Sequence, residues 1–125
     1  MGPRRYNANF EYILQASKYE TIETSDDLED GLNRCDVIYT DTFISMGQED
    51  DAAKRRKLFA KYQINADMLK LAKKDVKIMH CLPAHRGEEI TSEILDGKNS
   101  IVWEQARNKM VVEKAIILYL LNAAR

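Results

Sequence analysis

The chain has 125 residues, of which 45% are hydrophobic and 31% are charged, and this composition predicts one globular domain and excludes the disordered and fibrous classes. Nineteen basic and 20 acidic residues leave a net charge of −1, and no stretch combines Lys and Arg with aromatic residues along one face, which disfavours nucleic acid as a partner. The longest apolar run, Ala115–Leu121, is far shorter than the about 20 residues of a membrane span, and the first residues lack the apolar segment of a signal peptide.

We therefore expect a cytoplasmic chain without a membrane partner. The two cysteines, Cys35 and Cys81, lie far apart and fit a reducing compartment rather than a disulfide framework. The charge runs Lys54–Lys57 and Glu88–Glu89 are interpreted as solvated faces.

The first part of the chain is predicted to form helices and strands in alternation. Apolar residues with helical spacing predict a helix from about residue 10 to residue 19, with Asn7 or Asn9 as its cap. The β-favouring segment Tyr19–Thr24 predicts a strand that leads into a helix over Asp26–Leu32. Asp36–Thr40 is a continuous β-branched and aromatic run, which predicts a parallel strand buried on both faces.

The same alternation continues to the end of the chain. Acids precede bases after Gly47, which predicts a solvated helix through Phe59. Asn65 can cap a second helix with Met68 on its buried side, and Asp75–Cys81 predicts another strand. The last predicted elements are a short helix over Thr91–Leu95, a strand over Ser100–Trp103 and a long helix over Gln105–Ala123 that is apolar on almost all sides.

This order of elements predicts an α/β fold, a three-layer sandwich with a mostly parallel sheet of about four strands. The chain opens on a helix, whereas open α/β sheets usually begin with a central strand. We therefore expect an incomplete Rossmann-like domain.

Two polar clusters follow predicted strands, where ligands bind in α/β sheets. In the first, the carboxylate of Asp41 and the hydroxyl of Ser45 could meet one ammonium group, and Gly47 would allow close backbone approach. An ordinary Asx or Ser turn explains the same residues.

The second cluster contains a thiol, two imidazoles and a guanidinium, from Cys81, His80, His85 and Arg86. Such a set could serve nucleophilic catalysis, metal binding or oxyanion binding. Zinc is disfavoured because His80, Cys81, His85 and the distant Cys35 lack a standard ligand spacing. Adjacent strand residues point to opposite faces, so His85 is a better candidate base for Cys81 than His80 is. A Cys81 packed as a small hydrophobic residue remains the alternative.

In this order and separation, Asp41-Thr42-Phe43-Ile44-Ser45-Met46-Gly47 and His80-Cys81-Leu82-Pro83 resemble the DxxxSMG and HCLP motifs of the ornithine carbamoyltransferases. Gly2–Tyr6 is similar to a segment that follows a strand of the family's ornithine-binding domain, and Ala106–Lys109 is similar to the start of its final helix. The resemblance implies that residues 1–125 form part of the C-terminal ornithine-binding domain. The family's carbamoyl-phosphate domain and the first βαβ portion of the ornithine domain have no counterpart in the sequence.

The resemblance implies carbamoyl transfer from carbamoyl phosphate to the δ-amine of L-ornithine, giving citrulline and phosphate in arginine metabolism without a metal or organic cofactor. Asp41 would pair with the ammonium group of ornithine, and Ser45 and the Met46 backbone would fix the amino-acid end. Cys81, the catalytic candidate and hypothetical base, would line the reacting amine and the carbamoyl phosphate. Leu82 would offer its backbone carbonyl to the carbamoyl nitrogen.

Lys109 stands where the family usually has an Arg that contacts carbamoyl phosphate, and it would supply only a point charge there. Two alternatives to an ornithine site remain. A sister carbamoyltransferase would use an amine such as putrescine, although Ser45-Met46-Gly47 favours an amino acid. A noncatalytic half-site module would self-associate through its uncovered surfaces, whereas the family forms trimers through the other domain. By itself, the chain is expected to be inactive.

Overall fold

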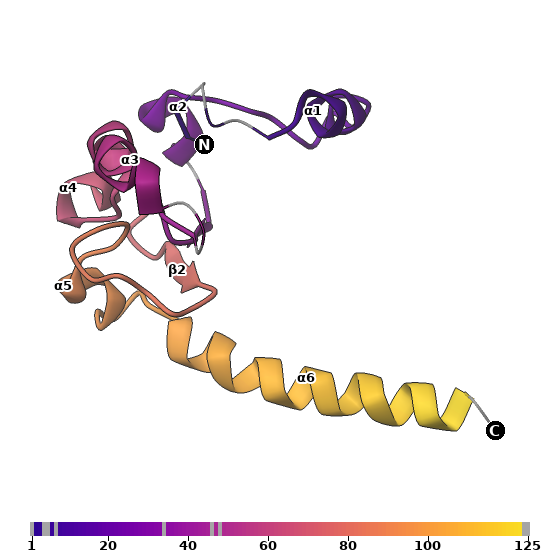
Figure 1. Cartoon of the computed structure of the whole chain (residues 1–125). Coiled ribbons are helices and arrows are strands. Elements are labelled where there is room, and N and C mark those ends of the chain that lie inside the picture. Colours follow the sequence, from indigo (N-terminus) through magenta and orange to yellow (C-terminus); the bar gives the residue numbers. More distant parts are fainter. Residues whose placement is uncertain are drawn as a thin grey trace.

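The computed structural model describes residues 2–3, 6, 8–33, 35–45, 47 and 49–123. Their arrangement is an α/β fold with a small parallel sheet, helices around it and one long helix that extends from it (Figure 1). The α-helices are α1 (Phe10–Ala16), α2 (Leu28–Leu32), α3 (Ala52–Phe59), α4 (Ala66–Leu69), α5 (Ser92–Leu95) and α6 (Val102–Ala123). Short 3-10 helices, Glu49–Asp51 and Ala60–Tyr62, flank α3.

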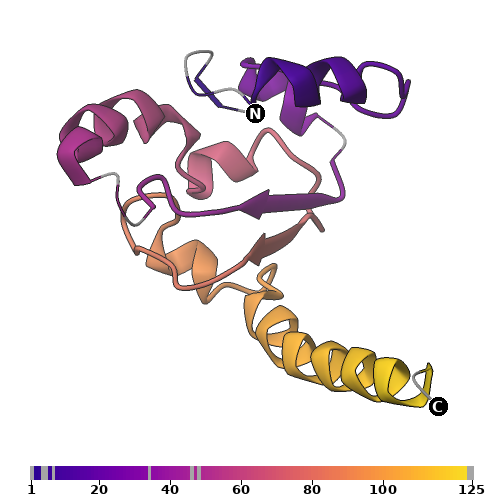
Figure 2. The ribbon, with the colours of Figure 1, turned by 45° about the vertical axis from the view of Figure 1, so that its right-hand side comes forward.

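The sheet of the described residues consists of β1 (Val37–Thr40) and β2 (Lys77–His80), which pair in parallel. The register sets Val37 opposite Lys77 and Thr40 opposite His80, so both strands end at the same edge (Figure 2). Both strands and their parallel direction confirm the sequence prediction. The loops that begin after Thr40 and after His80 therefore start side by side.

Two predicted strands are absent from the described residues, which form two strands rather than about four. Tyr19–Thr24 begins with turns, in which the Ile22 N–H donates to the Tyr19 carbonyl at 3.1 Å, and it lies beside no other strand. Ser100 forms only a single bridge to Ile78. Because α6 already begins at Val102, the segment is too short to continue as a strand.

The prediction that β1 is buried on both faces is also wrong. Ile38 is 9% exposed, but Val37 and Tyr39 on the other face are 47% and 56% exposed. An apolar run reveals the tendency to form a strand, but it does not show which face the rest of the fold will cover. Within the described residues, one face of β1 packs on the core and the other is open.

Side-chain caps begin three of the short helices. Asn9 accepts from the Glu11 N–H, Asp27 from the Glu29 N–H, and Asn65 from the Met68 N–H at 2.9 Å. The caps at Asn9 and Asn65 confirm the sequence prediction, although α1 ends at residue 16 rather than 19. These bonds satisfy backbone donors that a helix leaves free at its start.

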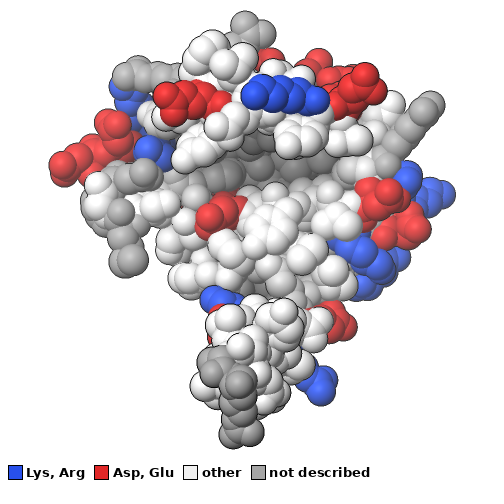
Figure 3. Space-filling view, turned by 90° about the vertical axis from the view of Figure 1, so that its right-hand side faces the viewer, with Lys and Arg blue, Asp and Glu red and all other residues white. Residues whose placement is uncertain are grey.

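The buried apolar cluster joins the two strands to α2, α4, α5 and the first residue of α6. Its members are Leu32, Ile38, Ile64, Met68, Val76, Ile78, Ile90, Ile94, Leu95 and Val102. Beyond Val102, α6 leaves this cluster, and Ile117 and Leu121 are 57% and 62% exposed. Figure 3 shows charges of both signs over the upper part of the molecule and a largely uncharged lower part, which α6 forms. No helix in the described part of the chain has the length and apolar character required to cross a membrane.

Candidate functional site

The two polar loops that follow β1 and β2 meet at the carboxyl edge of the sheet. Asp41 comes directly after β1 and Cys81 directly after β2, and the Cys81 thiol donates to Asp41 Oδ1 with a sulfur–oxygen distance of 2.9 Å. The parallel register explains this contact, since it sets Thr40 and His80 side by side. Residues separated by 40 positions thus form one polar pair, at the place where α/β sheets bind ligands.

This contact fixes which member of the pair carries the charge. The bond from Cys81, followed by the bond from the Thr42 N–H at 2.7 Å, lowers the pKa of the Asp41 carboxyl below its ordinary value. Partial loss of solvent, followed by the hydrogen bond to Asp41, raises the pKa of the Cys81 thiol. At neutral pH the pair is therefore a carboxylate and a protonated thiol with one negative charge. Such a pair can accept an ammonium group.

Below the loop of Cys81, His80 and Glu89 form a fully buried pair. The Leu82 N–H donates to His80 Nδ1 at 2.9 Å, so the imidazole proton is assigned to Nε2, which lies 3.0 Å from Glu89 Oε1. The same carboxylate oxygen accepts the His85 N–H at 2.6 Å. Glu89 thereby holds both the imidazole and the backbone of the following loop.

The interpretation of Glu88–Glu89 as a solvated face is wrong for Glu89, which is completely buried. A tight turn, with Gly87 at φ +87° and its N–H donating to the Ile90 carbonyl, reverses the chain and directs Glu89 inward. A charge run does not reveal such a turn, although a glycine just before it is a signal. Glu88 stays at the surface and pairs with Arg56 at 3.0 Å.

Leu82 has a left-handed backbone, with φ at +58°, and a cis peptide bond joins it to Pro83. Left-handed geometry in a residue with a side chain is unfavourable, and its occurrence beside a polar pair is typical of functional loops. The hydrogen bond from the Leu82 N–H to His80 stabilises it. Leu82 lines an open cavity of about 570 Å³ together with Cys81 and, from α6, Lys109.

Asp41 lines a second cavity of about 260 Å³, together with Thr42 and Phe43. The bond between Asp41 and Cys81 thus joins the walls of two neighbouring cavities. Ser45 is exposed in the same loop as Asp41, Gly47 has a φ of +83°, and Met46 lies outside the described residues.

The structure does not bring His85 to Cys81 through any hydrogen bond among the described residues. The His85 ring is half exposed, and its Nδ1 lies 4.0 Å from the second oxygen of Glu89. The Nδ1 of His80 lies 3.9 Å from the Cys81 sulfur, but it already accepts the Leu82 N–H. Neither imidazole is therefore placed as a direct base for the thiol.

Two supporting residues were not identified from the sequence. Gln105, in α6, accepts the His80 N–H at 3.1 Å and donates to the Tyr39 hydroxyl at 3.1 Å, so it ties the helix to both strands. Arg55 is half-buried rather than solvated: it donates to the Phe43 carbonyl in the Asp41 loop and lies over the ring of Tyr6. These contacts join distant segments and leave no local pattern.

Among the residues that the structure describes, one group of side chains offers ligand atoms for a metal ion. His85, Glu88 and Glu89 present atoms within 4.8 Å of one another. Glu88 is paired with Arg56 and Glu89 with His80, so a cation would have to compete with both. The set of His80, Cys81, His85 and Cys35 is not assembled, because Cys35 precedes β1 at the opposite end of the strand from Cys81.

A carboxylate and thiol at the carboxyl edge of a parallel sheet, above a buried imidazole and carboxylate, define an α/β protein with a polar site at the edge where such sheets bind ligands. The family model described as "Aspartate/ornithine carbamoyltransferase, Asp/Orn binding domain" matches residues 1–120. The chain belongs to the aspartate/ornithine carbamoyltransferase family.

Several similar proteins and solved structures are named ornithine carbamoyltransferases. An ornithine carbamoyltransferase of Archaeoglobus fulgidus is 46% identical over 121 residues, which cover 96% of this chain and 39% of that protein. One of Oceanobacillus iheyensis is 43% identical over 124 residues, which cover 95% and 38%. The crystal structure of an anabolic ornithine carbamoyltransferase of Campylobacter jejuni matches with a TM-score of 0.83 and 34% identity, covering 96% of this chain and 41% of that one. The chain therefore spans about two fifths of the length of these relatives.

Proposed function

We propose that this chain supplies the amino-acid side of a site that transfers the carbamoyl group of carbamoyl phosphate to L-ornithine. The observation that carries the proposal is the 2.9 Å contact between Asp41 and Cys81, which joins the DxxxSMG and HCLP motifs into one site. The names of the relatives, ornithine carbamoyltransferases at 43% and 46% identity, support the same substrates. In this proposal residues 1–125 are part of an ornithine-binding, Rossmann-like domain.

Ornithine would be held at Asp41, whose negative charge pairs with an ammonium group of the amino acid. Ser45 and the Met46 backbone would hold the amino-acid end of the ligand. The lowered pKa of Asp41 keeps the carboxylate charged throughout the neutral range. A zwitterion with a second amine fits this arrangement better than a simple diamine does, because Ser45 and the adjoining backbone would meet its carboxylate.

The reacting groups would meet on the Cys81 side of the pair. The neutral δ-amine attacks the carbonyl carbon, a C–N bond forms through a tetrahedral centre, and the C–O bond to phosphate breaks. One amine proton leaves the nitrogen, and phosphate accepts it as a leaving group. Leu82 would present its carbonyl to the carbamoyl nitrogen, and Lys109 would place a positive charge near the phosphate.

In its protonated resting state, the Cys81 thiol is best suited to orienting the amine. The raised pKa keeps the thiol protonated at neutral pH, and its proton is donated to Asp41. Any role as a base would first require the thiol to lose that proton. The buried pair of His80 and Glu89 would act as positioning residues, because they hold the backbone around Leu82.

An amide NMR titration of the 125-residue chain with L-ornithine tests the proposal. We expect saturable shifts at Asp41, Ser45 and Cys81, smaller shifts with putrescine and none with L-aspartate. Asp41→Asn should abolish the response, whereas Asp67→Asn, on the exposed surface of α4, should leave it unchanged. A folded chain that responds to none of the three ligands would contradict a preformed ornithine half-site and favour the noncatalytic module.

A further inference from the structure

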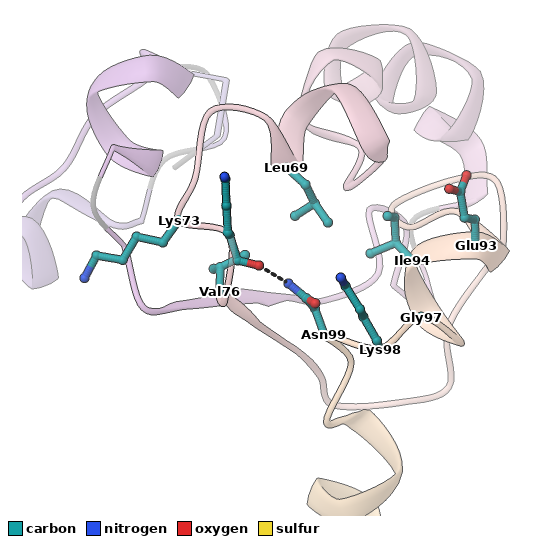
Figure 4. Close-up of a pocket in the computed structure, with 9 residues that line it drawn as sticks. Leu69, Lys73, Val76, Glu93, Ile94, Gly97, Lys98 and Asn99 are labelled. Carbon is teal, nitrogen blue, oxygen red and sulfur yellow. Dashed lines mark hydrogen bonds between the residues drawn. The ribbon is translucent and has the colours of Figure 1, made fainter.

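A cavity of about 390 Å³ lies at the amino end of β2, opposite the edge that carries Asp41 and Cys81. Two segments enclose it, one leading from α4 into β2 and the other leading from α5 to α6 (Figure 4). Its lining shares no residue with the cavities beside Asp41 and Cys81. A ligand in this cavity would therefore not occupy the proposed ornithine site.

The floor of the cavity is the edge of the apolar core. Leu69, Val76 and Ile94 line it: Leu69 is partly exposed and Ile94 is 7% exposed, whereas the Val76 side chain is fully buried and belongs to the core behind them. Apolar surface of this kind favours the hydrocarbon part of a ligand. The cavity lies at the small end of the usual size range of ligand sites.

Backbone and side-chain hydrogen bonds hold the two walls in place. The Asn99 side chain donates to the Lys74 carbonyl at 3.1 Å, the bond drawn in Figure 4, and joins one wall to the other. The Ile78 N–H donates to the Asn99 carbonyl at 2.9 Å, which fixes the second wall to β2. Such bonds preform the cavity, so little ordering would accompany binding.

The rim of the cavity carries a net charge of +1 once Lys73, which is paired with Asp36, is set aside. Lys73 points away from the cavity in Figure 4 and pairs with Asp36. Lys74 and Lys98 form no ion pair with any residue that the structure describes, and in Figure 4 Lys98 points toward the side where Leu69 and Ile94 lie. Glu93 is the acid in the lining. Two cations and one carboxylate favour a ligand with a single negative charge.

We propose that this cavity binds a small monoanionic carboxylate with an apolar body. The carboxylate would lie between the ammonium groups of Lys74 and Lys98, and the apolar body would rest on Leu69 and the accessible part of Ile94. Glu93 disfavours a second negative charge on the ligand. The site stands independently of the proposed carbamoyl transfer.

Hexanoate serves as the probe in an amide NMR titration of the 125-residue chain. We expect saturable shifts at Lys74, Ile94 and Asn99 and none at Asp41 or Cys81. Acetate, which lacks four methylene groups, should bind at least about tenfold more weakly because it does not reach the floor. Hexylammonium has an alkyl chain of similar length with the opposite charge and should not bind. Equal binding of hexanoate and hexylammonium, or no saturation with hexanoate, would overturn the proposal.

Two sets of variants test the rim without disturbing the core. The double variant Lys74→Gln with Lys98→Gln should weaken hexanoate binding about tenfold. Lys54→Gln with Lys57→Gln removes the same charge from the exposed surface of α3 and should leave binding unchanged. Glu93→Gln should strengthen binding, since it removes a like charge. If both double variants weakened hexanoate binding equally, the effect would come from the net charge of the chain, which would contradict a site at this cavity.

Discussion

Glu89 shows how one buried carboxylate can organise a functional loop without touching a ligand. One of its oxygens receives both the His80 imidazole N–H and the His85 backbone N–H, and the side chain is inaccessible to solvent. Without this acceptor, both donors would be buried or half-buried without a partner. The residue therefore supports the fold and the Cys81 loop together.

Glu89→Ala should lower the free energy of unfolding by roughly 2–4 kcal/mol, because it leaves two donors unpaired. Glu88→Ala is the matched control in the neighbouring position. Its ion pair with Arg56 lies at the surface, so its loss should change the stability by less than about 1 kcal/mol. Urea denaturation followed by circular dichroism measures both, and similar losses would contradict the role assigned to Glu89.

Asp41 gives a pH-dependent prediction. Its folded pKa is below the ordinary 3.8, so its contribution to stability is complete above pH 3.8 and disappears as the pH falls through the folded value. Carboxyl NMR should find its midpoint below 3.8, and Cys81→Ala should raise that midpoint. Cys35→Ala, at the other end of β1, should leave it unchanged. A midpoint unaffected by Cys81→Ala would show that the thiol does not bond to the carboxylate.

Cys81→Ser separates orientation from proton transfer in an active enzyme that contains these residues. A serine hydroxyl can still donate to Asp41, so the KM for ornithine should change little, whereas kcat should fall strongly if the thiol assists proton transfer. Steady-state kinetics at several ornithine concentrations distinguish the two. Equal losses in kcat and in affinity would contradict a role of the thiol in the reaction step.

At the scale of elements, local patterns predicted β1, β2, α3 and the caps at Asn9 and Asn65, because their signals lie within a few residues. The position of both polar clusters at the carboxyl edge of the sheet followed from the predicted parallel strands, whereas the bond between Asp41 and Cys81 itself was not predicted. The single bridge at Ser100 and the position of Glu89 could not be predicted, since each depends on where the chain turns next. Gln105 was missed for a similar reason, because its partners Tyr39 and His80 lie far away in the sequence.

The cap of α4 provides a test of one such local signal. Asn65→Ala removes the acceptor of the Met68 N–H and should cost about 1 kcal/mol of unfolding free energy. Asn65→Asp keeps the acceptor and should cost much less. Denaturant midpoints compare the two variants, and an equal loss would show that the weak bond from the Asn65 amide to Gln63, rather than the cap, stabilises this turn.

At the scale of the whole molecule, the uncovered surface of α6 is the dominant feature. Ile116, Ile117 and Leu118 are each more than half exposed, and exposed apolar surface of this extent favours association. We expect the 125-residue chain to associate as its concentration rises, as light scattering coupled to gel filtration would measure. Replacing Ile116 and Leu118 with Glu should reduce association. A monomer at every concentration would contradict the prediction.

The Gln105 contacts give α6 a mechanical consequence. Gln105 forms hydrogen bonds with the His80 backbone and the Tyr39 hydroxyl, and from Gln105 the helix extends about 27 Å to Ala123. The helix is thus anchored at Gln105, which binds the backbone of His80, the residue next to Cys81. A displacement of about 2 Å at the Ala123 end corresponds to a tilt of only about 4° at Gln105. A partner that displaces the far end of α6 would therefore cause a much smaller movement of the backbone that carries the Cys81 thiol.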